Sequence, residues 1–247
     1  MRYPILSDIH ANQEALDAVM AAASRDGYDE VICCGDVVGY GADPNSATEW
    51  VRANVKQIVR GNHDKACAAL DDLEWFNPAA RASALWTQQS LTAENLEYLR
   101  ALPRGPVAVT DFQILHGSPL DEDEYLMVAS EASMLTGYLE TRISFFGHTH
   151  VQGGFWFHRS GVWRIPGTSA AEEYTELMLD GESFYLINPG SIGQPRDRDP
   201  RAAWAYYEPE KRLVTYRRVN YAVERAQEKI RAAGLPDILA RRLSIGQ

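Results

Sequence analysis

Short apolar runs alternate with longer segments of helical periodicity in the first sixty residues. Residues 2–6 have the pattern of a strand, and residues 12–27 repeat apolar side chains at the spacing of one helix face. An asparagine opens the second segment and a glycine closes it, as is typical of helix caps. Residues 30–34 predict a second strand, residues 44–54 a second helix and residues 56–59 a third strand. This alternation predicts a parallel sheet with crossover helices.

The middle of the chain has a different pattern. Residues 77–102 are rich in helix-forming residues, with a capping signal at 92–95, and predict two helices that form a lid or a side layer. Residues 106–117 return to strand character with a turn near 110–111, and residues 142–147 predict another strand.

The second half of the chain has mostly strand character. Residues 153–167, 176–190 and 201–219 each have the pattern of a hairpin, and residues 222–233 predict a last amphipathic helix. No repeat, low-complexity tract or linker divides the sequence. We therefore expect a single domain over residues 1–247, with one sheet built from βα units and another from hairpins.

The composition narrows the possible partners and locations. The formal net charge of -10 argues against a broad basic face for anionic lipid or long nucleic acid. No apolar run is long enough to span a membrane, and Asp8 and His10 interrupt the N-terminus before a signal peptide could form. The three cysteines show no disulfide pattern. We expect a cytoplasmic protein that acts on a small molecule.

Residues able to bind a metal follow five of the predicted strands, in the motifs SDIH, GDVVGYG, GNHD, HGSP and GHTH. Ligands in open α/β sheets bind beyond the carboxyl ends of the strands, where such residues converge. Each motif alone also fits an ordinary turn or helix cap. Five of the six histidines, however, lie in these motifs, and only His158 lies elsewhere. The expected cluster comprises Asp8, His10, Asp36, Asn62, His63, Asp64, His116, His148 and His150.

Carboxylate, amide and imidazole groups together suit divalent Mn, Fe, Co or Zn. Side chains two residues apart in an extended chain point to the same side, so Asp8 with His10, and His148 with His150, are each expected to direct two donors to one place. Seven candidate ligands, one of them a carboxylate free to bridge, fit two metals about 3.5 to 4 Å apart better than one.

These motifs, in this order, resemble those of the calcineurin-like metallophosphoesterases. Together with GYG and the later NPGSIGQPRD, they are most similar to the small bacterial and archaeal phosphodiesterase branch of that superfamily. The resemblance runs from Asp8 to about Asp197. It implies an α+β fold, a four-layer α-β-β-α sandwich with two mixed β-sheets, and a binuclear site for divalent metal ions, with Mn²⁺ expected first and Fe, Ni, Co or Zn as alternatives.

The resemblance also implies a role for each motif residue. His63 is expected beside the leaving group, as a general acid or a charge stabiliser, with Asp64 holding its imidazole. Tyr40 is a candidate at the rim of the site, and Arg196 or Arg198 could contact a phosphate, although a solvated surface turn explains the arginines equally well. The implied metal ligands are Asp8, His10 and His150 for the first ion, Asn62, His116 and His148 for the second, and Asp36 for both.

The expected activity is hydrolysis of a small phosphate ester, as a phosphodiesterase or phosphatase, by a hydroxide that bridges the two metals and attacks phosphorus in line. The alternative is a non-catalytic metal-binding scaffold for protein interactions on the same fold. A scaffold could lose ligands or the catalytic histidine, and none is missing, which favours the enzyme. The net charge disfavours a nuclease acting on long nucleic acid, although a local basic groove would still permit one.

Overall fold

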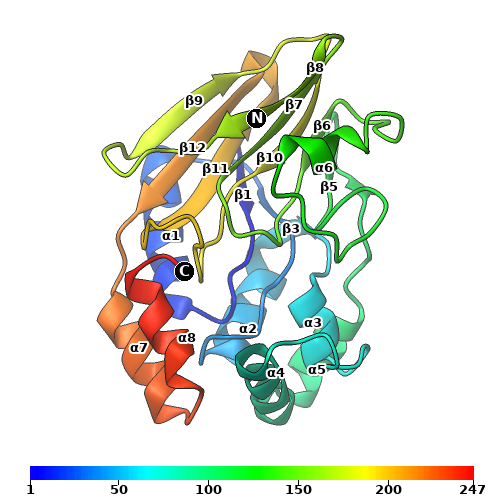
Figure 1. The fold of residues 1–247 in the computed structure, drawn as a ribbon. Helices are drawn as coiled ribbons and strands as arrows, with labels where there is room; N and C mark the ends of the chain where they lie inside the picture. The colour runs from blue at the N-terminus through cyan, green and yellow to red at the C-terminus, as the bar shows by residue number, and fades with distance from the viewer.

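Two six-stranded sheets form the centre of the computed structural model, which describes residues 1–247 (Figure 1). The first sheet has the order β3 (Val55–Ile58), β2 (Val31–Cys33), β1 (Tyr3–Leu6), β11 (Ala202–Glu208), β12 (Leu213–Val219) and β9 (Tyr174–Met178). The second has the order β4 (Val107–Ala108), β5 (Gln113–Ile114), β6 (Ile143–Phe145), β10 (Phe184–Asn188), β7 (Gly153–His158) and β8 (Gly161–Pro166).

Both sheets are mixed, as the family resemblance implied. The expectation of one sheet built from βα units and another from hairpins is wrong, because the β11–β12 hairpin joins the first sheet and the second contains parallel strands. β1, β2 and β3 are parallel, whereas β11, β12 and β9 extend the first sheet in antiparallel fashion. In the second sheet β5, β6 and β10 are parallel, and the remaining pairs are antiparallel. The parallel strands of both sheets end at the same side of the molecule, above the helices of Figure 1. Loops that leave these ends therefore meet.

Helices cover the outer face of each sheet, which gives the four layers of an α-β-β-α sandwich. Only α6 (Ala129–Ser133) covers the second sheet, packing with neighbouring residues against Phe155 and Phe157. The layer on the first sheet is much thicker. It contains α1 (Gln13–Asp26), α2 (Pro44–Asn54), α3 (Asn62–Cys67), α4 (Pro78–Ser90) and α5 (Ala93–Arg100).

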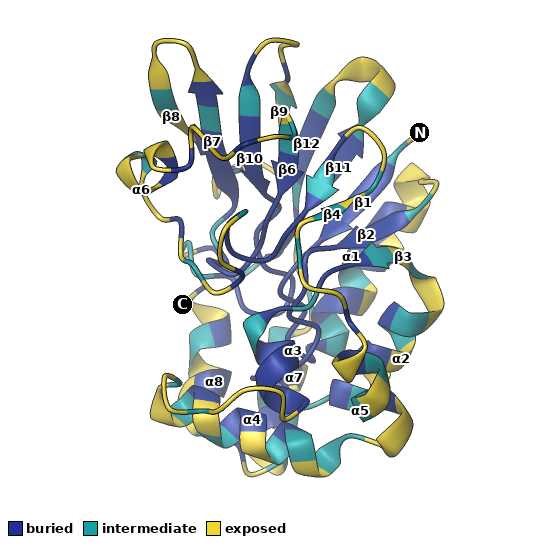
Figure 2. Ribbon diagram, turned by 90° about the vertical axis from the view of Figure 1, so that its right-hand side faces the viewer, coloured by how far each residue is buried: buried dark blue, intermediate teal, exposed yellow.

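The core between the two sheets is strongly aromatic. Tyr3 and Tyr207 of the first sheet pack against Phe112, which leads into β5, with ring centroids 5.5 and 5.2 Å apart. Ile5 and Ile187 face the same layer and are fully buried. Full burial of such a side chain contributes roughly 1.5–3 kcal/mol to the free energy of folding. The two sheets therefore form a firm support for the loops at their ends, which are also buried in Figure 2.

The helix predictions are confirmed together with their capping residues. The Asn12 side chain accepts the backbone N–H of Ala15 at the start of α1, and Gly27, at φ 76°, follows its end. Thr92 caps α5 through the backbone N–H of Asn95. The predicted pair of helices in residues 77–102 is present as α4 and α5, which pack against α2 and α3 as a side layer. None of the helices has the length and apolar character that a membrane crossing requires.

The predicted hairpin at residues 176–190 is wrong. β9 pairs with β12 in the first sheet, whereas β10 lies between β6 and β7 in the second. The chain turns where the Asp180 carboxylate accepts the backbone N–H of Ser183 and the hydroxyl of Tyr185, and then crosses between sheets. β9 alternates exposed and half-buried positions, as an edge strand does, whereas β10 is almost continuously buried.

The helix predicted at residues 222–233 is present as α7 (Val223–Ala232), but it is not the last one. Gly234, at φ 71°, reverses the chain, and α8 (Asp237–Arg241) and the short 3₁₀ turn η2 (Arg242–Ser244) follow. Another 3₁₀ turn, η1 (Pro209–Lys211), joins β11 to β12. Five residues are too few to display helical periodicity, which is why the sequence pattern missed α8.

Replacing Ile187 by alanine should lower the free energy of unfolding by about 2–5 kcal/mol, because it leaves a cavity between the two sheets. The same substitution at Ile238 is the matched control, since that side chain is 50% exposed on α8 and should change stability by less than about 0.5 kcal/mol. Urea unfolding measures both values. Equal losses would contradict the assignment of the core to the layer between the sheets.

Candidate metal centre

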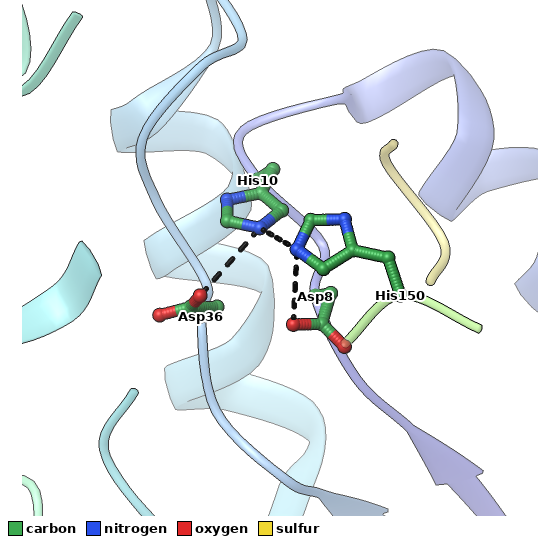
Figure 3. Close-up of side chains that lie close together, drawn as sticks. All are labelled: Asp8, His10, Asp36 and His150. Atoms are coloured by element: carbon green, nitrogen blue, oxygen red, sulfur yellow. Dashed lines mark hydrogen bonds and ion pairs between the residues drawn. The ribbon is translucent and has the colours of Figure 1, made fainter. Parts of the chain in front are cut away.

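The loops that follow the parallel strands bring the predicted ligands together. Asp8 and His10 follow β1, Asp36 follows β2, and His150 follows β6, and these four side chains offer ligand atoms within 4.8 Å of one another (Figure 3). Asp36 also forms a second such group with His116 and His148. All of these residues are buried. One carboxylate is thus common to two adjoining groups of donors.

Short distances in the first group bring ring nitrogens and carboxylate oxygens to one point. His10 Nε2 lies 3.0 Å from His150 Nε2 and 3.5 Å from Asp36 Oδ2, and His150 Nε2 lies 3.5 Å from Asp8 Oδ1, as the dashed lines of Figure 3 mark. Two imidazole nitrogens at 3.0 Å repel when both present lone pairs. A cation between them removes that repulsion.

The second group has the same arrangement around the other side of Asp36. His116 Nε2 lies 3.3 Å from Asp36 Oδ2 and 3.3 Å from Asn62 Oδ1. His148 Nδ1 lies 3.0 Å from the same amide oxygen. Asn62, the first residue of α3, therefore faces the histidines with its oxygen, the atom that binds cations.

Backbone carbonyl groups fix the orientation of these imidazole rings. The Nδ1 atom of His10 lies 3.0 Å from the Val38 carbonyl oxygen, that of His116 lies 2.7 Å from the Cys34 oxygen, and that of His150 lies 2.6 Å from the Gln194 oxygen. A hydrogen on Nδ1 donates to the carbonyl and leaves the Nε2 lone pair facing the centre. His148 is reversed, because its Nε2 lies 3.0 Å from the Asp123 oxygen and Nδ1 faces inward.

The extended geometry expected for the two-residue spacings is wrong. Asp8, His10, Asp36, His148 and His150 all have positive φ angles, between 48° and 65°. The chain leaves each strand and coils at once in the left-handed region, which costs of order 1–3 kcal/mol for a residue other than glycine. The spacing still brings Asp8 and His10 into one group, but it sends His148 and His150 to opposite sides of Asp36.

Two glycines make room for the site. A side chain at Gly61 would overlap the Asp36 carboxylate, and one at Gly39, at φ 87°, would come 2.5 Å from His63 Nδ1. Only glycine combines these close approaches with the backbone conformation that Gly39 requires.

Burial and mutual charge set the protonation of the cluster. Burial raises the pKa of Asp8 to about 7, and it lowers the pKa of His10 to about 4 and that of His148 to about 3. Burial also opposes charge on Asp36 and His116, but the attraction between these two side chains outweighs the effect of burial. This attraction holds the pKa of Asp36 well below its usual value and raises the pKa of His116 to about 10. The metal-free cluster therefore holds one ion pair among neutral imidazoles, which carry the lone pairs that a metal needs.

The donor set fits divalent cations. Oδ2 of Asp8 and Oδ2 of Asp36 are buried without a hydrogen-bond partner. An ionised carboxylate oxygen only accepts, so its burial without a donor is costly unless a cation is present. With an amide oxygen and inward-facing imidazoles around them, these oxygens have the chemistry of Mn, Fe, Co or Zn ligands.

His63 lies beside this cluster, but Asp64 does not hold its imidazole. The Asp64 carboxylate accepts the backbone N–H groups of Asp36, Val37 and Gly61, so it supports the loop after β2. The ring of His63 is held by packing instead, with its centroid 4.3 Å from that of Tyr40 and 4.9 Å from that of Phe76. The expected orientation of His63 by Asp64 is therefore corrected.

A pocket of about 250 Å³ opens beside the cluster and gives it access to solvent. Its lining includes His63 and His148, the aromatic residues Trp75, Phe76 and Tyr125, and the acidic residues Asp71, Asp72 and Asp123. The Trp75 side chain is 93% exposed. Sequence reasoning missed these three aromatic residues, because no motif marks them and they lie in loops whose paths the pattern does not define.

The two candidate arginines occupy different environments. Arg196 is partly buried and donates from Nη2 to the Tyr40 hydroxyl at 3.1 Å and to Gln194 Oε1 at 3.2 Å. Arg198 is exposed on the surface. Tyr40 is buried against His10, with ring centroids 4.7 Å apart. Tyr40 and Arg196 therefore border the cluster, as their positions in the motifs suggested.

Comparison with known proteins identifies relatives over the whole length of the chain. The family model of the calcineurin-like phosphoesterase superfamily domain matches residues 1–211. A metallophosphoesterase from Sphaerobacter thermophilus is 38% identical with a TM-score of 0.86, over 100% of this chain and 99% of that one. An uncharacterized protein of Methanocaldococcus jannaschii, MJ0912, is 31% identical, over 98% of this chain and 97% of its own length. The hypothetical protein PH1004 from Pyrococcus horikoshii OT3 shares the fold, with 20% identity and a TM-score of 0.78 over 100% of this chain and 98% of that one.

Replacing Asp36 by asparagine should weaken Mn²⁺ binding more than about tenfold, because the amide keeps the shape but removes the charge that both groups share. Metal content after dialysis, measured by inductively coupled plasma mass spectrometry, tests this. Asp17→Asn is the matched control, since Asp17 is exposed on α1 and should retain full metal content. Equal metal content in both variants would contradict a centre at Asp36.

The loop that carries Asp123 and Tyr125 is held by an ion-pair network. Glu122 accepts two hydrogen bonds from Arg60, at 3.0 and 2.8 Å, and lies 3.3 Å from the Lys65 ammonium. Burial raises the pKa of Glu122, but the hydrogen bonds from Arg60 and the charge of Lys65 outweigh it, so that the pKa lies below its usual value.

A carboxyl group whose pKa is depressed by folding stabilises the protein above its unfolded pKa, and this stability is lost as the pH falls through the folded pKa. Glu122→Gln should therefore lower the free energy of unfolding by about 1–3 kcal/mol at pH 7 and by much less near pH 3. Urea unfolding at both pH values measures the difference. Glu94→Gln, at an exposed pair with Arg52, should have little effect at either pH.

Proposed function

The chain belongs to the calcineurin-like phosphoesterase superfamily, and from this premise we propose that it hydrolyses small phosphate esters at the cluster around Asp36. The observation that carries the proposal is the convergence of two buried carboxylates, an amide oxygen and four inward-facing imidazoles beside an open pocket. A structural cluster has no need of such a pocket or of buried carboxylate oxygens without donors.

The residues would hold two ions, with one carboxylate serving both. Divalent cations in such a centre polarise phosphoryl oxygens and supply a nucleophile from water near neutral pH. Mn²⁺ is our first expectation, with Fe, Ni, Co and Zn as alternatives, because the donors are nitrogen and oxygen. Asp8, His10 and His150 would hold one ion, Asn62, His116 and His148 the other, and Asp36 both.

His63 would stabilise the leaving group. Burial lowers the pKa of His63 well below its usual value, against the attraction of Asp36, so the ring is neutral at physiological pH. A neutral imidazole still donates one hydrogen bond, and His63 faces the pocket where a leaving group would lie. Of the two roles expected for this residue, a donor that stabilises developing charge fits its environment better than a protonated general acid.

The pocket indicates the size of the substrate. A volume of about 250 Å³ suits a small ester, and its aromatic walls suit an organic leaving group. The chain's net charge of -10 gives no support for binding long nucleic acid. We therefore propose a small phosphodiester or phosphomonoester as substrate.

Metal-stripped protein should not hydrolyse an aryl phosphodiester or its monoester, and adding Mn²⁺ should restore turnover. Asp36→Asn should abolish the restored activity, whereas Asp17→Asn should keep it. His63→Ala should lower kcat by about 10²–10³-fold with metal content unchanged, because one preorganised donor to the leaving oxygen is lost. The ratio of diester to monoester turnover defines the preferred class.

Absence of turnover with Mn²⁺, Fe²⁺, Ni²⁺, Co²⁺ and Zn²⁺, in protein that binds these ions stoichiometrically, would overturn the proposal. That result would favour the alternative function, a non-catalytic metal-binding scaffold for protein interactions. Full turnover in His63→Ala would contradict only the proposed role of His63 in stabilising the leaving group.

A further inference from the structure

Two arginine side chains meet beside Tyr40 without an acidic partner. Arg196 and Arg242 both donate to Gln194 Oε1, at 3.2 and 3.1 Å. Their guanidinium carbons lie 5.6 and 5.8 Å from the centroid of the Tyr40 ring. Both side chains are partly buried, and Nε of each is buried without a hydrogen-bond partner.

Neither arginine forms an ion pair, in contrast to three arginines that lie near them in the sequence. Arg201 pairs with Asp199, Arg218 with Asp197 and Arg241 with Asp237. The pKa of Arg242 is lowered by burial and then by the positive charge of Arg196. Two partly buried cations side by side repel each other, and an anion bound between them would remove that repulsion.

The arginine pair borders the candidate metal centre. Tyr40 separates the two, with its ring 4.7 Å from that of His10 and 4.3 Å from that of His63. The backbone N–H of Arg196 also donates to the His150 oxygen at 3.1 Å. An anion on the pair would therefore lie next to the phosphate held at the centre, or be that phosphate.

Arg242 reaches this place from the end of the chain. It lies in η2, beyond residues 1–211 that the family model matches. The C-terminal segment, red in Figure 1, folds back toward the strands, and the Gly246 oxygen accepts the Arg198 backbone N–H at 2.9 Å. The tail thus delivers a guanidinium that the superfamily motifs do not include.

We propose that Arg196 and Arg242 form a clamp for phosphate oxygens of the substrate, with Arg242 supplied by the C-terminal tail. This inference rests on the proposed function, because it assigns the clamp to the same substrate. Guanidinium groups bind phosphate through paired N–H donors. The hydrogen bonds above use Nη2 of Arg196 and Nη1 of Arg242, which leaves the other donors of each guanidinium group for phosphate oxygens. The oxygens belong either to the phosphate that is cleaved or to a second phosphate of the same substrate.

Binding of inorganic phosphate to metal-loaded protein, measured by isothermal titration calorimetry, tests the clamp without turnover. Arg242→Gln should weaken phosphate binding about tenfold or more, because a charged hydrogen-bonding group is lost. Arg242→Lys should have a smaller effect, since it keeps the charge but not the planar fork. Arg241→Gln is the matched control, because it removes the same charge from an exposed position one residue away and should leave binding unchanged.

Equal phosphate affinity in wild type and Arg242→Gln, with matching metal content and melting temperature, would overturn the clamp even if the enzyme is active. Loss of phosphate binding in Arg242→Gln without any hydrolysis by wild type would support the clamp and reject the proposed function. If Arg242→Gln lowers the melting temperature, its weaker phosphate binding could reflect misfolding, and Arg242→Lys then decides. Weaker phosphate binding by Arg242→Lys at the wild-type melting temperature supports the clamp, and unchanged binding overturns it.

Kinetics distinguish the two sources of phosphate oxygens. If the clamp holds the phosphate that is cleaved, Arg242→Gln should lower kcat/KM by a similar factor for an aryl monophosphate and an aryl diphosphate. If it holds a second phosphate, only the diphosphate should be affected. An unchanged kcat/KM for both substrates would overturn the clamp.

Discussion

Two carboxylates buried at one point are the constraint on which the rest of the structure depends. Asp36 accepts the backbone N–H of His63 at 2.8 Å, and Asp8 accepts that of His148 at 3.1 Å, so each carboxylate ties its own loop to another. Their remaining oxygens lack donors. Because buried carboxylates without a full set of hydrogen bonds are costly, the surrounding layers must hold the loops in place against that cost. The aromatic core between the sheets and the thick helical layer perform this task.

The sequence correctly predicted those features that depend on residues close together in the chain. Asn12 and Thr92 cap their helices where the pattern indicated, because capping depends on a few neighbouring residues. The ligand motifs converge because parallel strands deliver their ends to one edge. By contrast, the partners of β9 and β10 depend on which sheet buries each strand, and this is set by contacts far apart in the chain. The pattern at residues 176–190 could not distinguish the two outcomes.

The errors within the site have a similar origin. Side-chain spacing suggested extended segments, whereas Asp8, His10, His148 and His150 adopt left-handed conformations, which are uncommon for residues other than glycine and are held here by the surrounding fold. Asp64 follows His63 directly, yet its carboxylate is fully used by backbone N–H groups of another loop. The identities of the residues were therefore enough to predict which side chains gather in the cluster. The contacts that support each side chain could be seen only in the folded structure.

The position of Arg242 near the end of the chain affects the order in which the site is completed. During synthesis on a ribosome, every motif that carries a candidate metal ligand emerges before α7 and α8 do, so the cluster around Asp36 would assemble before Arg242 is in place. The tail packs against the rest of the protein through buried side chains such as Ile230 and Leu239, and the Lys229 ammonium adds ion pairs at 2.6 Å to Glu14 and 2.8 Å to Asp43. With the proposed clamp, changes confined to the tail would alter which anions are accepted without disturbing the loops that carry the candidate metal ligands.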